Sequence, residues 1–181
     1  MRLCDPPLIP ARAIQKLVAE LATAVDRDGD GQDLVLMAVL KGAIYFAADL
    51  SRQLETPHRL EFCRARSYAG NESTGQVQIP IWPDKSLAGQ RVLLVEDILD
   101  TGRTTAVLLD RLKLEGPADT RVCALLNKPS RRVIPIPEDY VGLTIGNHFV
   151  VGYGLDYEEH YRGLDAVHVL EDDGSSGLDG G

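Results

Sequence analysis

The sequence predicts an α/β fold with a mainly parallel sheet flanked by helices, and two observations carry this prediction. Short apolar runs alternate with segments of helical periodicity along most of the chain. Such alternation is typical of parallel strands whose connecting helices cover both faces of the sheet. In addition, the small polar segment 67–76 precedes alternating apolar residues at 77–81, which predicts a flexible hairpin loop inserted into this layout.

Length and composition predict one globular domain. The chain has 181 residues, of which 44% are hydrophobic and 25% charged, and this is enough apolar surface for one sizeable core. We expect the domain to span residues 1–170. The segment 171–181 contains too little apolar surface to order itself, and we expect a disordered tail there.

Charge and cysteine content restrict the expected partners. The formal net charge of −8 argues against nucleic acid and makes small molecules the expected ligands. The three cysteines are far apart and form no CxxC pair, which indicates neither a disulfide framework nor a zinc cluster and fits a reducing cytosol. The longest apolar run, residues 34–40, is too short for a bilayer, and no signal-peptide pattern opens the chain. We therefore expect a cytoplasmic protein with no membrane partner.

The first predicted helix begins after Pro10, a residue that suits a first helical turn. Its apolar residues recur at helical spacing: Ile14, Leu17, Val18, Leu21 and Val25. The polar stretch 26–33, DRDGDGQD, then matches the opening of a calcium-binding loop. Met37 stands at the twelfth position, where such a loop needs a bidentate glutamate, so we favour a solvated turn over a calcium site.

Strands and helices alternate in the rest of the chain. Residues 34–53 indicate a strand, a turn at Lys41 and Gly42, and a helix, and a further strand is expected near residues 60–66. Residues 92–112, VLLVEDILDTGRTTAVLLDRL, indicate a buried strand followed directly by a helix. Three more apolar strands are expected at 121–127, 148–154 and 166–170.

A dense polar cluster lies where the strand of 92–112 meets its helix. We expect Glu96 and Asp97 to end the strand, with their side chains on opposite faces. Either carboxylate can accept hydrogen bonds from sugar hydroxyls or hold a hydrated Mg²⁺. The turn that follows contains Asp100, Thr101, Gly102, Arg103, Thr104 and Thr105. Because unpaired N–H groups at a helix amino terminus attract anions, this turn is suited to a phosphate monoester. Helix capping by Asp100 or Thr101, worth about 1 kcal/mol, is the alternative.

Several segments of the chain resemble a known enzyme family. VLLVEDILDTGRTT is similar to the phosphoribosyl pyrophosphate (PRPP) motif of type I phosphoribosyltransferases. VLKGAIYFAADL, the loop that contains SY, and NKPSRRV with HFVVGYGLDYEEHYRGL narrow the resemblance to the hypoxanthine-guanine branch. The resemblance covers residues 34–170 in consistent order. It implies the type I phosphoribosyltransferase fold with a small base-recognition hood, assembled as a homodimer or homotetramer.

The resemblance implies a purine salvage transferase that converts hypoxanthine or guanine plus PRPP into IMP or GMP and pyrophosphate, with Mg²⁺ as cofactor. Two alternatives stay open. One is a related enzyme for xanthine, orotate or uracil, although Lys128 and the segment FVVGYGLD argue for a purine. The other is a non-enzymatic PRPP-sensing regulator that binds RNA or DNA, which an acidic chain without a basic extension disfavours.

The resemblance also implies roles around the sugar phosphate. Asp100 matches the acid placed near purine N7, where it exchanges a proton with the base. The backbone and hydroxyls of residues 100–105 would hold the 5′-phosphate. Glu96 and Asp97 would serve the ribose hydroxyls, and together with Asp156 they would supply the magnesium sites.

Two further loops are implied to contact the reacting groups. Lys41 and Gly42 match a loop with a strained, often cis, peptide that presents backbone groups to pyrophosphate. Arg162 matches an arginine that meets pyrophosphate. Ser67 and Tyr68 begin a lid that would exclude water from the reacting centre.

The base-recognition residues follow the phosphate turn in the sequence. Lys128 matches the lysine that donates to purine O6, Phe149 the ring that stacks on the base, and Val150 a backbone contact to its far edge, with Asp156 on the same side. Without the resemblance, Phe149 and Val150 would be interpreted as an ordinary buried strand and Lys128 as a solvated lysine. The turn GNHF, residues 146–149, departs from the Pro-Asp-containing turn usual in the family, so the order of purine preference stays open.

Overall fold

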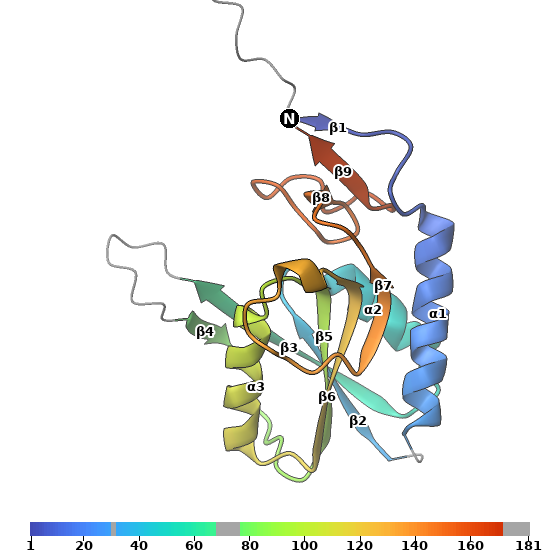
Figure 1. Ribbon diagram of the computed structural model, residues 1–181. Helices are drawn as coiled ribbons and strands as arrows, with labels where there is room; N and C mark the ends of the chain where they lie inside the picture. Colours follow the sequence, from blue (N-terminus) through green and yellow to red (C-terminus); the bar gives the residue numbers. More distant parts are fainter. Residues whose placement is uncertain (30–31, 68–76, 172–181) are drawn as a thin grey trace, which may run out of the picture.

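The computed structural model describes residues 1–29, 32–67 and 77–171. A six-stranded main sheet forms the body of the protein, and a three-stranded small sheet lies at one end of it (Figure 1). The helices are α1 (Ala11–Arg27), α2 (Ile44–Gln53) and α3 (Arg103–Glu115), with a 3-10 turn at Pro129–Arg131. The strands are β1 (Arg2–Leu3), β2 (Leu34–Val39), β3 (His58–Ser67), β4 (Val77–Ile81), β5 (Arg91–Leu99), β6 (Asp119–Asn127), β7 (Tyr140–Thr144), β8 (Val150–Val151) and β9 (His168–Glu171). None of the described helices is long and apolar enough to cross a membrane.

The main sheet is mostly parallel, as predicted. Its strands lie in the order β4-β3-β2-β5-β6-β7, and every neighbouring pair except β3 and β4 runs parallel. β3 and β4 are the antiparallel arms of the predicted hairpin, whose connecting residues 68–76 lie outside the described residues. β2 is buried along its whole length, as expected for a central parallel strand covered on both faces.

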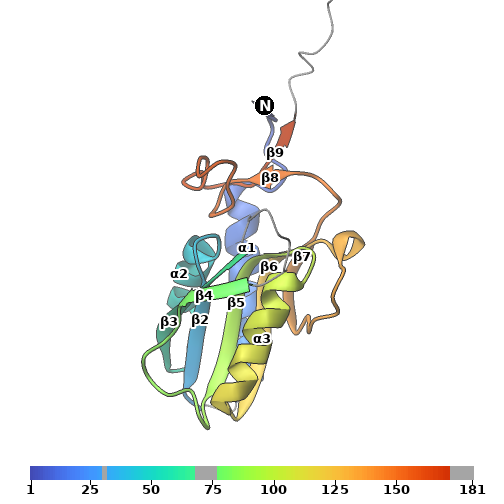
Figure 2. The same ribbon diagram turned by 90° about the vertical axis from the view of Figure 1, so that its left-hand side faces the viewer.

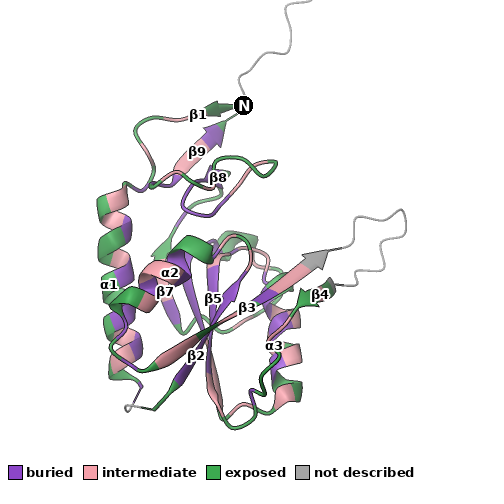
Figure 3. Cartoon of the chain, turned by 180° about the vertical axis from the view of Figure 1, so that it is seen from behind, coloured by how far each residue is buried: buried purple, intermediate pink, exposed green. Residues whose placement is uncertain are grey.

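Alternate residues of the central strands face two different hydrophobic cores. Leu36 and Leu93 belong to a core that α1 and α2 complete, whereas Met37 and Leu94 belong to a second core with residues of α3. Figures 1 and 2 show the same division, with α3 on one face of the sheet and α1 with α2 on the other. Seen from behind in Figure 3, the central strands are mostly buried. The predicted helices therefore cover both faces of the sheet.

The small sheet joins the two ends of the described chain. Its strand order is β1-β9-β8, and both pairs are antiparallel. The predicted strands at 148–154 and 166–170 supply β8 and β9, but β8 is limited to Val150–Val151 and neither strand enters the main sheet. β8 contains Val150, one of the residues to which the resemblance assigns base recognition, so this sheet corresponds to the implied base-recognition hood.

The sequence analysis missed β7, an edge strand of the main sheet. The segment YVGLT has a weak apolar pattern that Gly142 interrupts. A Cβ atom at Gly142 would lie 2.6 Å from the backbone oxygen of Leu125 in β6. Close packing against the neighbouring strand therefore explains the glycine, and hydrophobic alternation is a poor guide to this edge.

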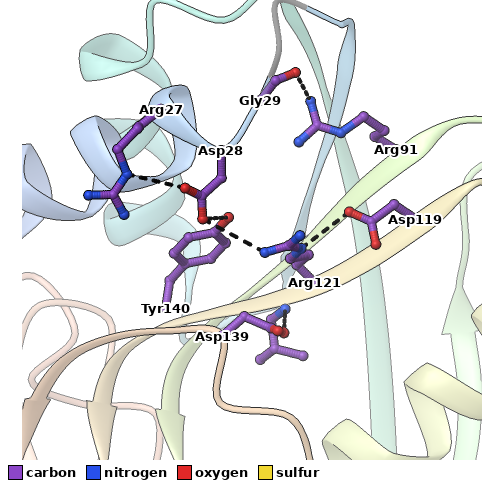
Figure 4. A network of polar contacts seen from close by, with 9 residues as sticks. Arg27, Asp28, Gly29, Arg91, Asp119, Arg121, Asp139 and Tyr140 are labelled. Carbon is purple, nitrogen blue, oxygen red and sulfur yellow. Dashed lines mark hydrogen bonds and ion pairs between the residues drawn. The ribbon is translucent and has the colours of Figure 1, made fainter.

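A polar network ties the end of α1 to the starts of β5, β6 and β7 (Figure 4). The Asp28 carboxylate accepts a hydrogen bond from the Tyr140 hydroxyl at 3.1 Å and lies 3.7 Å from the Arg121 guanidinium. Arg91 donates to the backbone oxygen of Gly29 at 2.6 Å. These contacts hold the amino ends of three parallel strands against the first helix, at the edge of the sheet away from the small sheet.

The polar stretch that begins at residue 26 contributes to this end of the fold. The carboxylate of Asp26 accepts hydrogen bonds from the backbone N–H groups of Glu55 and Thr56, at 3.0 and 2.9 Å. Burial favours a raised pKa for Asp26, but these N–H groups and the Thr56 hydroxyl outweigh it and lower the pKa. Met37, the twelfth position of the calcium pattern, is a buried residue of β2. Residues 30 and 31 lie outside the described residues.

Candidate active site

A cavity of about 380 Å³ lies at the carboxyl ends of β5 and β6. In open α/β sheets, ligands bind at this edge because the loops that follow the strands converge there. The cavity is lined by the end of β5, by the segments after β5 and β6, and by residues on both sides of β8. These residues are Asp97, Ile98, Asp100, Lys128, Arg131, Asn147, His148, Phe149, Val150, Leu155 and Asp156.

The two adjacent acids of β5 point to different faces of the sheet, as predicted. Glu96 is buried and accepts a hydrogen bond from the Thr105 hydroxyl of α3 at 3.1 Å. Asp97 lies on the other side, beside Gly42 and the cavity. The prediction that these acids end the strand is wrong, because β5 continues to pair with β6 as far as Leu99. Because its side chain faces α3, Glu96 does not line the cavity.

Burial raises the pKa values of both acids. It raises the pKa of Glu96 to about 8, and the charge of Asp97 adds to this shift while the Thr105 hydroxyl opposes it. It raises the pKa of Asp97 to about 6, because the nearby backbone N–H groups and Arg162 only partly offset burial and the charge of Asp156 adds to it. Both carboxylates are therefore harder to ionise than ordinary acids, and Glu96 more so than Asp97.

Three carboxylates are implied as magnesium ligands, but they do not form one cluster. Glu96 contacts α3, whereas the charges of Asp97 and Asp156 influence each other at the cavity. Among the described residues, no group of three or more His, Cys, Asp or Glu side chains is arranged to hold a metal ion. Asp97 and Asp156 suit a Mg²⁺ ion that keeps several waters and is shared with substrate phosphates, because such ions take only one or two protein carboxylates.

Close backbone packing holds the turn after β2 against the site. A Cβ atom at Gly42 would lie 1.8 Å from the Asp97 carboxylate, and one at Gly154 would lie 1.9 Å from the backbone oxygen of Gly42. Gly154 also has a φ of +102°, which side chains of L residues disfavour. The cis peptide bond of this turn joins Leu40 to Lys41. The two glycines thus bring the β2 turn, Asp97 and the segment after β8 into contact.

The predicted phosphate turn connects β5 to α3. Gly102 is the N-cap of α3 with a φ of +82°, and a Cβ atom there would lie 2.4 Å from the backbone oxygen of Ile134. The alternative in which Asp100 or Thr101 is the N-cap is wrong, because Gly102 occupies that position, although the Thr101 hydroxyl accepts a hydrogen bond from the backbone N–H of Arg103 at 3.5 Å. The helix begins at Arg103, so the N–H groups of its first turn lack intrahelical acceptors.

The hydroxyl-bearing residues of this turn differ in exposure. Thr104 is exposed, as is Arg103, whereas Thr105 is buried and its hydroxyl is directed to Glu96. The backbone oxygen of Thr101 accepts the N–H groups of Val133 and Ile134, at 2.9 and 3.0 Å. The turn is therefore held by two contacts, one from Thr105 to Glu96 of β5 and one from Thr101 to the segment after β6.

Two predicted cavity residues, Asp100 and Lys128, make contacts with the segments after β6 and before β8. The carboxylate of Asp100 lies 2.8 Å from Nε of Arg131. Lys128 is buried, and its Nζ donates to the backbone oxygen of His148 at 2.7 Å. Burial lowers the pKa of Lys128, although the charge of Asp100 opposes the shift. The interpretation of Lys128 as a solvated lysine is therefore wrong.

Further predicted residues lie in β8 and in the segments on either side of it. The Phe149 side chain is 51% exposed and meets Tyr157 edge to face, with ring centroids 5.8 Å apart. Val150 is buried in β8, so the ordinary-strand interpretation holds for Val150 but not for Phe149. Asp156 pairs with Arg162 at 2.8 Å, and Arg162 also donates to the backbone oxygen of Gly154 at 2.7 Å.

The predicted lid begins at the end of β3. Ser67 is the last residue of β3, and Tyr68 lies outside the described residues. Five cavity residues were not predicted: Ile98, Arg131, Asn147, His148 and Leu155. Each lies within three positions of a predicted residue, so proximity in the sequence was the available signal.

Comparison with known proteins identifies relatives of the chain. A family profile described as "Phosphoribosyl transferase domain" matches residues 9–158. The chain is 43% identical over 171 residues to a hypoxanthine-guanine phosphoribosyltransferase of Mycobacterium avium, an alignment that covers 91% of this chain and 84% of the relative. It is 40% identical over 163 residues to a hypoxanthine phosphoribosyltransferase of Salmonella typhimurium, with 88% and 92% covered.

Solved structures show the same relationship. A hypoxanthine phosphoribosyltransferase from Staphylococcus aureus superposes with a TM-score of 0.89 at 37% identity, covering 96% of this chain and 95% of that chain. A hypoxanthine-guanine phosphoribosyltransferase from Bacillus anthracis gives a TM-score of 0.88 at 38% identity, covering 94% of this chain and 100% of that chain.

The two packed glycines predict losses of stability that differ in size. Gly154→Ala should lower the free energy of unfolding by about 1–3 kcal/mol or more, because the new Cβ meets backbone at a positive φ. Gly42→Ala should cost less than about 1 kcal/mol, because the Asp97 side chain can move aside. Urea denaturation of both variants measures the difference. Equal losses would show that the Gly154 backbone is not constrained as described.

Proposed function

The chain belongs to the phosphoribosyltransferase family, in its hypoxanthine-guanine branch, and is a transferase enzyme; from this premise we propose that it converts hypoxanthine or guanine plus PRPP into IMP or GMP and pyrophosphate. The observation that carries the proposal is one cavity that contains a buried lysine, an exposed aromatic ring and three carboxylates. These are the groups that a 6-oxopurine and a magnesium-bound sugar phosphate require. The reaction is a step of purine salvage.

We assign recognition of the purine 6-oxo group to Lys128. An ammonium group has three donors and no acceptor, so it can donate to O6 while keeping its bond to His148. It cannot accept a hydrogen bond from the 6-amino group of adenine, which gives a physical reason for discrimination between the two kinds of purine. The exposed ring of Phe149 supplies a surface on which the base stacks.

We assign the proton transfer to Asp100. In the proposed reaction, N9 of the base forms a bond to C1 of the ribose, the bond from C1 to pyrophosphate breaks, and the base loses one proton. Asp100 lines the cavity, 2.8 Å from Nε of Arg131, and its carboxylate would accept this proton near N7. General base catalysis of this kind contributes about 10²- to 10⁴-fold to the rate.

The PRPP molecule would extend from α3 to the turn after β2. The backbone N–H groups in the first turn of α3 would bind the 5′-phosphate, and Asp97, which lines the cavity, would accept hydrogen bonds from the ribose hydroxyls. Asp97 and Asp156 would hold Mg²⁺, which supplies positive charge to the leaving pyrophosphate. Lys41 and Arg162 would contact the pyrophosphate end, because Arg162 pairs with Asp156 at 2.8 Å and shares the Glu159 carboxylate with Lys41.

A xanthine-preferring enzyme is the second candidate, and one observation favours it. Asn147 and His148 line the cavity in the turn that departs from the usual family pattern. The Asn147 amide can donate to the 2-oxo group that xanthine carries and hypoxanthine lacks. Guanine presents an amino group at the same position, so the residues of this turn can change the preference among the three bases.

A substrate panel tests the proposed function directly. With PRPP and Mg²⁺, we expect IMP from hypoxanthine and GMP from guanine, and no nucleotide from adenine, uracil or orotate. Chromatography of the products measures this, with xanthine as the decisive sixth base for the second candidate. Failure of all six bases in the presence of bound PRPP would reject the enzyme and favour a regulatory protein.

Replacing Lys128 should weaken binding of the base. In Lys128→Met, which keeps the length of the stem, the KM for hypoxanthine should rise about tenfold or more, because a charge-assisted hydrogen bond is lost. The KM for PRPP should change little. Lys113→Met, an exposed lysine of α3, is the matched control. An unchanged KM for hypoxanthine would remove Lys128 from base recognition.

Replacing Asp100 should affect turnover more than binding. Asp100→Asn should lower kcat about 100-fold or more, with a KM for PRPP within about threefold of the original, because the base that accepts the proton is removed. Asp110→Asn on the exposed side of α3 controls for the change in charge. Steady-state kinetics with both substrates measure the effect. Equal losses in kcat and in PRPP affinity would contradict the assignment.

A further inference from the structure

One carboxylate holds two cations at the edge of the proposed PRPP site. Oε2 of Glu159 accepts a hydrogen bond from Nζ of Lys41 at 2.6 Å and lies 3.4 Å from the Arg162 guanidinium. Lys41 follows β2 and Arg162 follows β8, so Glu159 bridges two separate parts of the chain. Its side chain is 60% exposed, and a ligand can therefore reach and replace it.

The backbone of Glu159 is anchored to a residue of the cavity. Its N–H donates to Oδ2 of Asp156 at 2.9 Å, and Oδ1 of the same carboxylate pairs with Arg162 at 2.8 Å. Glu158, Glu159 and Tyr161 all have φ values between 49° and 73°. Non-glycine residues adopt this conformation only where the surroundings hold them in place. The loop therefore holds the backbone of Glu159 beside Asp156 and within reach of the two cations.

The charges at this edge do not favour a further anion. The two cations Lys41 and Arg162 face three carboxylates, those of Asp97, Asp156 and Glu159. Asp97 and Asp156 line the cavity, where the proposed function assigns them to Mg²⁺. Glu159 does not line the cavity, and its carboxylate is bound to the two cations instead. It therefore occupies the positive groups that a diphosphate needs.

We propose that Glu159 is an internal competitor for the pyrophosphate end of PRPP. Its carboxylate neutralises Lys41 and Arg162 in the free enzyme, and the diphosphate displaces it on binding. This inference rests on the proposed function, which assigns the two cations to the pyrophosphate end. Exposed ion pairs contribute little to stability, so Glu159 lowers the affinity by about two- to fivefold without closing the site. The same competition helps pyrophosphate to leave after the reaction.

The test compares two glutamates that are adjacent in the chain. Glu159→Gln removes the competing charge, and we expect the dissociation constant of pyrophosphate with excess Mg²⁺ to fall about threefold in calorimetric titration. The KM for PRPP should fall by a similar factor, and the KM for hypoxanthine should stay the same. Glu158→Gln makes the same change in net charge, yet the Glu158 side chain has no hydrogen bond or ion pair among the described residues. It should leave all three constants unchanged.

Other outcomes overturn the proposal. Unchanged or weaker pyrophosphate binding in Glu159→Gln would reject the competition, and an equal gain in Glu158→Gln would show an effect of net charge alone. Should Glu159→Gln fail to fold, Glu159→Asp is the second variant, because it keeps the charge but shortens the side chain. The dissociation constant of pyrophosphate should fall in Glu159→Asp as well. If the unmodified protein forms no nucleotide while Glu159→Gln still binds pyrophosphate more tightly, the proposed function fails and the competition stands.

Discussion

The arrangement of the site depends on the close approach of the backbone at Gly42 to the backbone at Gly154 and to Asp97. Two parts of the chain that are distant in sequence meet there because Gly154 carries no side chain, and the Asp97 carboxylate takes the space beside Gly42 that a side chain would need. The contact brings Lys41 to the segment that holds Asp156 and Arg162. A steric requirement at two backbone positions thus determines which charges face one another.

The central strands supply a second constraint. They are buried on both faces, so polar groups are concentrated at their ends, where the cavity lies. Glu96 is the exception, since it is an acid inside the fold with a hydroxyl partner and a raised pKa. Its bond to Thr105 joins β5 to the first turn of α3. The turn proposed to bind phosphate is therefore fixed by a buried polar contact directly beneath it.

Much of this arrangement could be predicted from the sequence, for identifiable reasons. The apolar runs of β2 and β5 and the periodicity of α1 and α3 gave the parallel sheet and its helices, and opposite faces for Glu96 and Asp97 followed from strand geometry. The edge strand β7, the length of β5 and the burial of Lys128 depend on contacts between distant segments. Local patterns do not contain that information. The places of Arg131 and His148 in the cavity were missed for the same reason.

The small sheet has a consequence for how the protein is made. β1 comes from the first residues of the chain and β9 from the last residues described, and each residue of β1 pairs with one of β9. On the ribosome, α1 and the parallel strands are complete while β9 is still being synthesised. The small sheet closes only after β9 has emerged, and it requires contacts of the greatest sequence separation, which form slowly. Because Val150 of β8 belongs to both that sheet and the cavity, the part of the cavity that β8 supplies depends on β9, the last of the described strands to be synthesised.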